Sequence, residues 1–228
     1  MGSLGKRAAM VGYQPPKKLR KFKKEKYVRN YIPRHITLEK KVIDVNYLAQ
    51  VHDGGSLSYL LNGCVQGTDI INRVGRRIML KSVLVRLIFN VDVASTPISQ
   101  TWRVAIIYDK QTNATYPPGG SGSQPTVGAT FFKPVVGSSS YISPLNIDQR
   151  DRFEIISDEH ITLSKNGPEE VALKIYRKLN HEVTFNSGNS GIYSDIVTGA
   201  LWINLYNNVS SSNAAGFNLS SRVRFEDA

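Results

Sequence analysis

A dense cluster of cations near the start of the chain is the segment best suited to bind a charged partner. The run from residue 15 to residue 26 reads PPKKLRKFKKEK, so two prolines precede seven lysines and arginines. Cations in this context stay extended and exposed, which suits both a phosphate backbone and the acidic groove of a nuclear import receptor. We therefore expect the cluster to contact nucleic acid, a nuclear import receptor, or each in turn, with a solubilising tail as the alternative. The predicted nuclear localisation residues are Lys17, Lys18, Arg20, Lys21, Lys23 and Lys24.

Aromatic residues are interleaved with these cations. They are Tyr13, Phe22, Tyr27 and Tyr31. In single-stranded nucleic acids, bases stack on aromatic faces while Lys and Arg follow the phosphates. The pattern favours a single strand over a duplex. An alternative is that the chain uses Tyr27, Val28, Tyr31 and Ile32 to anchor this segment on a folded domain.

A second basic segment, NRVGRR at residues 72–77, precedes a predicted strand. Its arginines are Arg73, Arg76 and Arg77. Guanidinium groups grouped beside a glycine can bind phosphates or the carboxylates of a neighbouring subunit. A charged turn that leads into a strand is the equally plain interpretation.

Catalytic patterns are absent or generic, and we expect no enzymatic activity, no cofactor and no metal. The four histidines are not spaced as metal ligands; they are His35, His52, His160 and His181. No known phosphate-binding or nucleophile motif occurs in the sequence. A nuclease could use carboxylates to hold magnesium, and the candidates are Asp148, Asp151, Asp158 and Glu159. The simpler explanation is that they balance Arg150 and Arg152.

The charge of the chain is divided unevenly. The net charge is +11, yet residues 1–41 hold 13 Lys/Arg against 2 Asp/Glu, while residues 42–228 hold 16 of each kind. A neutral body with a basic arm implies a polyanionic partner. No apolar run approaches the roughly 18 residues of a membrane-spanning helix, so membrane insertion is not expected. Cys64 is the single cysteine, which excludes a disulfide within the chain.

The composition changes near residue 35. Residues 1–34 are rich in Lys, Arg and Pro and poor in aliphatics, so we expect a basic arm that is disordered when free. Residues 35–228 are expected to form one domain, because short runs of Val, Ile, Thr, Tyr and Phe alternate with turn residues. Strands are predicted at residues 36–50, 77–93, 101–109, 151–157, 160–164, 171–186, 196–208 and 217–226.

Eight strands without a long helical segment predict an all-β sandwich or barrel of the jelly-roll type. The long connections, at residues 51–74, 110–128, 137–148 and 187–195, are expected to carry contacts. In the strand at 77–93 both alternating faces are apolar, so we expect it to be covered on both sides over part of its length. Residues 129–135 fit a short helix or an edge strand equally well.

The order of several motifs resembles the coat proteins of small circular single-stranded DNA viruses, of the geminivirus and circovirus kind. The similarity is collinear over nearly the whole chain and is carried by NRVGRRIMLKSVLV at 72–85, WRVAIIYDK at 102–110, RDRFEI at 150–155, YRKLN at 176–180, GALWINLY at 199–206 and RVRFED at 222–227. The resemblance implies one eight-stranded antiparallel jelly roll, an icosahedral shell around circular single-stranded DNA, an arm inside the shell and nuclear import of the subunit.

The resemblance also implies a set of DNA-binding residues. In the arm they are Lys6, Arg7, Lys17, Lys18, Arg20, Lys21, Lys23, Lys24, Lys26, Arg29 and Arg34, and on the domain Arg73, Arg76 and Arg77. The expected partners are single-stranded DNA, other copies of the chain in a shell of about 60 subunits, and a nuclear import receptor. The expected locations are the virion and the host nucleus. The alternative is a cellular nucleic-acid-binding protein with a basic tail.

Overall fold

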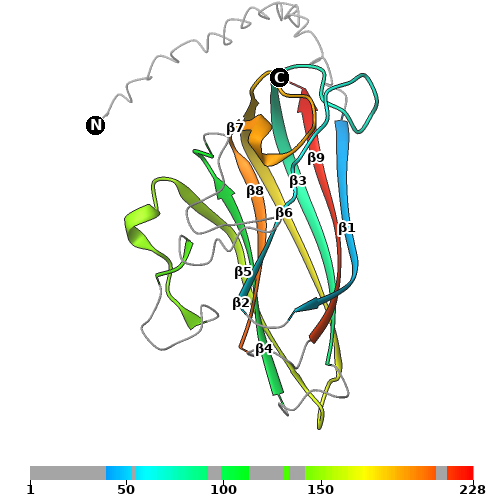
Figure 1. Cartoon of the computed structure of the whole chain (residues 1–228), viewed down its shortest axis with the longest axis vertical. Helices are drawn as coiled ribbons and strands as arrows, with labels where there is room; N and C mark the ends of the chain where they lie inside the picture. Colours follow the sequence, from blue (N-terminus) through cyan, green and yellow to red (C-terminus); the bar gives the residue numbers. More distant parts are fainter. Residues whose placement is uncertain are drawn as a thin grey trace, which may run out of the picture. The chain divides into compact units, whose positions relative to one another are not determined.

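The structure is a computed structural model that describes residues 40–52, 55–91, 99–112, 131–133, 142–208 and 215–227. These residues belong to one compact unit of the chain, and nearly all of its regular structure is β-strand (Figure 1). Within the described ranges, helical structure includes the 3-10 turns η2, Ile147–Gln149, and η3, Tyr193–Asp195, and the single residues Phe131 and Ile142. No helix in these ranges has the length and apolar character needed to cross a membrane.

The strands form two antiparallel sheets. The five-stranded sheet has the order β1-β9-β3-β6-β7. Its strands are β1 (Lys40–His52), β9 (Ala215–Asp227), β3 (Arg77–Asn90), β6 (Glu170–Phe185) and β7 (Ile196–Thr198). The four-stranded sheet has the order β2-β8-β4-β5. Its strands are β2 (Gly55–Leu60), β8 (Ala200–Asn207), β4 (Ser99–Asp109) and β5 (Phe153–Ser164).

The core lies between the two sheets. Trp102 of β4 is fully buried, and its ring centroid lies 4.8 Å from that of Phe89 on β3 and 6.0 Å from that of Phe217 on β9. Tyr59 on β2 also contacts Phe217, at 6.2 Å. The buried side chains of both sheets form a single hydrophobic cluster. Eight long strands in this order make a jelly roll, with the short β7 added at one edge, so the predicted fold class is confirmed.

The outer faces of the two sheets differ. In the four-stranded sheet every residue of β8 is buried, so both faces of that strand are covered. Part of the cover is Phe132, which lies 5.3 Å from the ring of Tyr206, and Phe131, which lies 4.5 Å from the ring of Phe153. Of the segment 129–135, whose structure the sequence left open, the structure describes residues 131–133, where Phe131 is helical and Phe132 forms an isolated bridge with Leu145. In the five-stranded sheet, by contrast, β6 alternates between exposed and more buried residues.

Three predicted strand boundaries were wrong. Strand β2 lies in a segment predicted to be a connection, because GSLSYL begins with weak strand formers. The predicted strand 196–208 is two strands in different sheets, and they separate at Gly199, whose φ is +89°. The two predicted strands at 151–157 and 160–164 are one strand, β5, because Asp158 and Glu159 continue the ladder opposite Ala105 and Val104.

Strand β3 has apolar residues on both faces for a different reason from the predicted one. Its register shifts between Leu80 and Ser82 relative to both neighbouring strands. Leu80 therefore faces the core before the shift, and Val83 and Val85 face it afterwards. On the outer face Ile88 is 40% exposed, so the predicted cover on both sides is not found at this end of the strand.

Candidate nucleic-acid interface

Most of the predicted DNA-binding residues, and all of the predicted nuclear localisation residues, lie outside the described residues. They are Lys6, Arg7, Lys17, Lys18, Arg20, Lys21, Lys23, Lys24, Lys26, Arg29 and Arg34. Their contacts remain a prediction. The structure describes the other three members of the set, in the segment that leads into β3.

Arg73 is buried rather than presented to a partner. Its Nη1 donates to the carbonyl of Gly75 at 2.7 Å and its Nη2 to the carbonyl of Gly188 at 2.5 Å. The guanidinium also lies 4.2 Å from the centre of the Phe185 ring. Burial lowers the pKa of Arg73 from its usual value. The arginine ties two distant segments together and is buried, so we do not include it in a nucleic-acid surface.

Arg76 and Arg77 lie on the surface. The backbone carbonyl of Arg76 accepts a hydrogen bond from Phe185 at 2.7 Å, while its side chain is exposed. Arg77 lies 3.4 Å from Glu182, and both side chains are largely open to solvent. A surface pair of this kind is weak and leaves the guanidinium available to phosphates.

The acidic residues considered for a nuclease are dispersed. Asp158 is held by Arg103, whose Nε and Nη2 donate to its two oxygens at 2.8 and 2.6 Å. The side chain of Asp151 is fully exposed and lies 3.8 Å from Arg150. Within the described part of the chain no three His, Cys, Asp or Glu side chains gather as metal ligands. Among the described residues, the expected balance of these carboxylates against Arg150 and Arg152 is found only for Asp151, because Arg152 pairs with Asp109 instead.

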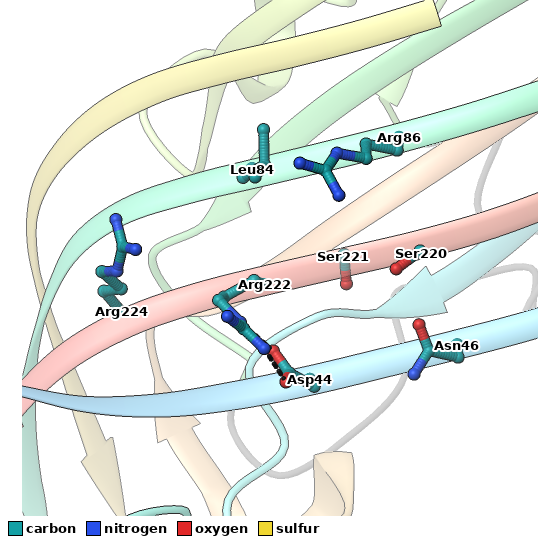
Figure 2. Close-up of a pocket in the computed structure, with 8 residues that line it drawn as sticks. All are labelled: Asp44, Asn46, Leu84, Arg86, Ser220, Ser221, Arg222 and Arg224. Atoms are coloured by element: carbon teal, nitrogen blue, oxygen red, sulfur yellow. Dashed lines mark hydrogen bonds and ion pairs between the residues drawn. The ribbon is translucent and has the colours of Figure 1, made fainter. Parts of the chain in front are cut away.

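An open hollow of about 330 Å³ lies on the exposed face of the five-stranded sheet. Figure 2 shows that Arg86 projects from β3, Arg222 and Arg224 from β9, and Asp44 from β1. Arg222 donates from Nε and Nη2 to the two oxygens of Asp44 at 2.7 and 2.6 Å. These hydrogen bonds lower the pKa of Asp44 and raise the pKa of Arg222. Arg86 and Arg224 have no ion-pair partner within the described ranges.

The sequence prediction missed this hollow, although a signal for it was present. Arg222 and Arg224 are two residues apart in a strand, and residues two apart share one face. The neutral overall charge of residues 42–228 concealed the signal, because the acidic residues that balance these cations lie mostly elsewhere. Counting charges separately for each face of each strand would have found it.

Exposed aliphatic side chains gather at the loops that follow β2 and β6, and we call this group the apolar end. The two loops touch, since the backbone of Gln66 donates to the carbonyl of Asn189. The side chains of the group are each about half exposed or more, and they are Val65, Ile70, Ile71, Val74 and Ile192. Such groups on a folded domain mark contact surfaces.

A five-stranded and a four-stranded antiparallel sheet in this order, packed around one core, define a jelly-roll protein of the class found in viral capsids and lectins. A family model described as the satellite tobacco necrosis virus coat protein matches residues 13–228. The chain therefore belongs to the family of the satellite tobacco necrosis virus coat protein. A search of the curated proteins gave no match.

Solved structures of other viruses show weaker similarity. One from Desmodium yellow mottle tymovirus is 10% identical and covers 86% of this chain and 93% of its own, with a TM-score of 0.31. One from Cocksfoot mottle virus is 10% identical and covers 96% and 97%, with a TM-score of 0.31. The empty capsid of Triatoma virus is 13% identical and covers 79% and 89%, with a TM-score of 0.28. The fold assignment depends on the strand order and not on these similarities.

The predicted membership of a viral coat-protein class is confirmed at that level. The matching family, however, is not the geminivirus or circovirus family that the motif order resembles. Its description names a coat protein and no kind of nucleic acid, so the expected DNA genome is not supported by the match.

Proposed function

We propose that the protein is a structural coat subunit without catalytic activity, that its copies self-assemble into a closed icosahedral shell, and that its basic arm packages circular single-stranded DNA. The observation that carries this proposal is the coat-protein family match over residues 13–228, combined with a charge excess confined to residues 1–41. A cellular protein with a basic tail would have the charge pattern but not the family. A shell of about 60 subunits is the expected assembly.

Packaging follows from the charge of the arm. Residues 1–34 carry 11 Lys/Arg and 1 Glu, enough to neutralise about ten phosphates. The logarithm of the binding constant for a single strand would then fall with the logarithm of salt concentration with a slope near −7, from about −0.7 per phosphate. Fully extended, 34 residues reach roughly 110 to 120 Å, so the arm can follow a genome without a fixed register.

The experiment compares the full chain with a full-length variant in which Lys17, Lys18, Arg20, Lys21, Lys23 and Lys24 are changed to Gln. Salt titrations against unstructured oligonucleotides should give a slope near −7 for the original chain. The salt slope of the variant should be shallower by about 4, because six cations are lost. Binding should not depend on base composition. An equal slope and affinity for the two chains would show that the arm is not the packaging element.

Single-stranded RNA is the competing cargo, because phosphates and unpaired bases are common to both and the matched family is not the one that the motif order resembles. Particles purified from cells that express the chain should contain nucleic acid that DNase destroys and RNase leaves intact. The reverse result would replace DNA with RNA in the proposal. A chain that stays monomeric at high concentration, with and without either nucleic acid, would contradict the coat-subunit assignment itself.

Nuclear import is the second part of the proposal and would bring the subunit to the host nucleus before it enters the virion. A reporter fused to residues 13–29 should accumulate in the nucleus through a host import receptor. Changing Lys17, Lys18, Arg20 and Lys21 to Ala should return the reporter to the cytosol. Undiminished import by the changed segment would place the signal elsewhere.

A further inference from the structure

The exposed face of the five-stranded sheet carries more cations than the hollow alone contains. The cross-strand register extends the hollow onto β6, where alternate residues point outward. Arg86 lies opposite Lys174, and Ser82 lies between Arg224 on one neighbouring strand and Lys178 on the other. These four cations are all exposed, and they frame a surface that spans β9, β3 and β6. We call this surface the basic sheet face; its cations are Arg86, Lys174, Lys178, Arg222 and Arg224.

The charge of the basic sheet face is not balanced by its surroundings. Asp44 is the one acidic residue that pairs with a member of the set, and it pairs with Arg222. The other four cations have no ion-pair partner among the described residues. Arg86 on β3 and Lys174 on the neighbouring strand β6 are also directly opposite each other, and like charges in this arrangement destabilise a sheet. The fold therefore keeps like charges together at some cost, although the domain as a whole is nearly neutral.

An aromatic ring lies in the middle of these cations. Tyr176 is 46% exposed, and its cross-strand neighbour on β3 is Leu84, which lines the hollow. Along β6 it lies between Lys174 and Lys178, two residues from each and on the same face. An exposed ring flanked by cations is the arrangement on which an unpaired base stacks while phosphates meet the charges.

We infer that the basic sheet face is a second binding site for single-stranded nucleic acid, in which the four unpaired cations contact phosphates and Tyr176 stacks on a base. This inference builds on the proposed function, since it assigns part of the cargo contact to the ordered domain. It also sets the orientation of the subunit. The five-stranded sheet faces the cargo inside the shell, and the covered four-stranded sheet faces outward.

The charge test uses the full chain and two matched variants. The first changes Lys174 and Lys178 to Gln. The second changes Lys110 and Lys133 to Gln, which removes the same charge from exposed positions at the end of β4 and next to Phe132 of the cover. The salt slope for a single strand should become shallower by about 1.4 for the first variant, from two lost phosphate contacts, and should not change for the second. Equal behaviour of the two variants would overturn the inference.

The stacking test changes Tyr176 to Ser and, as its control, to Phe. The Ser variant should bind a single strand about tenfold more weakly, while the Phe variant should keep the original affinity, because only the ring is required. Ultraviolet crosslinking of the original chain to an oligonucleotide should modify the peptide that contains Tyr176. Equal affinities for the Ser and Phe variants, with no such crosslink, would exclude stacking at this position.

Two further outcomes separate this inference from the proposed function. If the arm variant binds as tightly as the original chain and the Lys174/Lys178 variant does not, the arm proposal fails and the basic sheet face is supported. If the Lys174/Lys178 variant binds oligonucleotides normally but no longer assembles, the face is a contact between subunits. That result would overturn the inference and leave the arm proposal intact.

Discussion

At the scale of single residues, arginines that are largely buried link segments that lie far apart in the sequence. Arg103 is the most highly connected of them. It binds Asp158 with two hydrogen bonds, donates from Nη1 to the carbonyl of Ser143 at 2.6 Å, and lies 3.7 Å from the centre of the Phe132 ring. It thereby fastens the cover of the four-stranded sheet to β4 and β5. Arg152 makes a similar two-bond contact with the buried Asp109.

Changing Arg103 to Met should destabilise the protein by about 3 kcal/mol, because it leaves the carboxylate of Asp158 and the Ser143 carbonyl without a donor. The double variant Arg103→Met with Asp158→Asn should recover part of that loss, since the unpaired charge is removed. Chemical denaturation should be used to measure the free energy of unfolding of the two variants and of Asp158→Asn alone. If the double variant is as unstable as the sum of the single ones, the two residues are not coupled.

Asp44 sets the charge of the basic sheet face, and changing it to Asn should strengthen nucleic-acid binding. The variant removes a negative charge and releases Arg222 for a phosphate, so the salt slope should become steeper by about 0.7. Arg222 lowers the pKa of Asp44 below 3.8, so Asp44 stays ionised as the pH falls from 8 to 5. Protonation of Asp44 should therefore not increase the nucleic-acid affinity of the original chain between pH 8 and pH 5. A rise that the Asn variant lacks would contradict this account.

At the scale of elements, alternation in the sequence was enough to find most strands but not to divide them between sheets. The long strands β3, β4, β6 and β9 were predicted close to their observed limits, because a face buried against a sheet selects apolar residues at every second position. The burial of Arg73 was beyond that reasoning, since it depends on Gly188 and Phe185, more than 100 residues away in the chain. The basic sheet face was only partly within reach of that reasoning: spacing along β9 places Arg222 and Arg224 on one face, but their grouping with the cations of β3 and β6 depends on strand register.

Gly199 marks the point where the chain passes from one sheet to the other. Its φ of +89° is unfavourable for any residue with a side chain, and an added Cβ would lie 2.5 Å from the carbonyl oxygen of Glu182. Changing Gly199 to Ala should therefore cost about 1 to 3 kcal/mol. The matched control is Gly167→Ala, where the nearest atom to an added Cβ is 3.6 Å away. Thermal unfolding should separate the two variants, and equal midpoints would contradict the prediction.

At the scale of the whole molecule, the described domain has three surfaces of different chemistry. The four-stranded sheet is covered over β4 and β8, the five-stranded sheet is basic and open, and the apolar end presents aliphatic side chains at the loops. A coat subunit has to contact other copies of itself, and the apolar end is the surface whose exposure in water is least favourable. We therefore expect it to be buried between subunits.

Changing Ile70 and Val74 to Ser should reduce assembly into closed multimers without unfolding the subunit, since both side chains are already more than half exposed. The control is Leu48→Ser, which removes a side chain that is 70% exposed on β1. Light scattering and negative-stain images should show shells for the control and mainly small species for the double variant. Normal shells from the double variant would show that the subunits meet elsewhere.

The cover on the four-stranded sheet has a consequence for how the protein tolerates change. The cover is packed on the four-stranded sheet by the rings of Phe131 and Phe132 and by the contacts of Arg103. The hydrophobic core then lies between this sheet and strands β9, β3 and β6. Substitutions on the two sides have no common neighbour, so their effects should add independently. In the orientation that we infer, such a subunit can diversify the outward surface over its four-stranded sheet while the basic sheet face stays under separate selection.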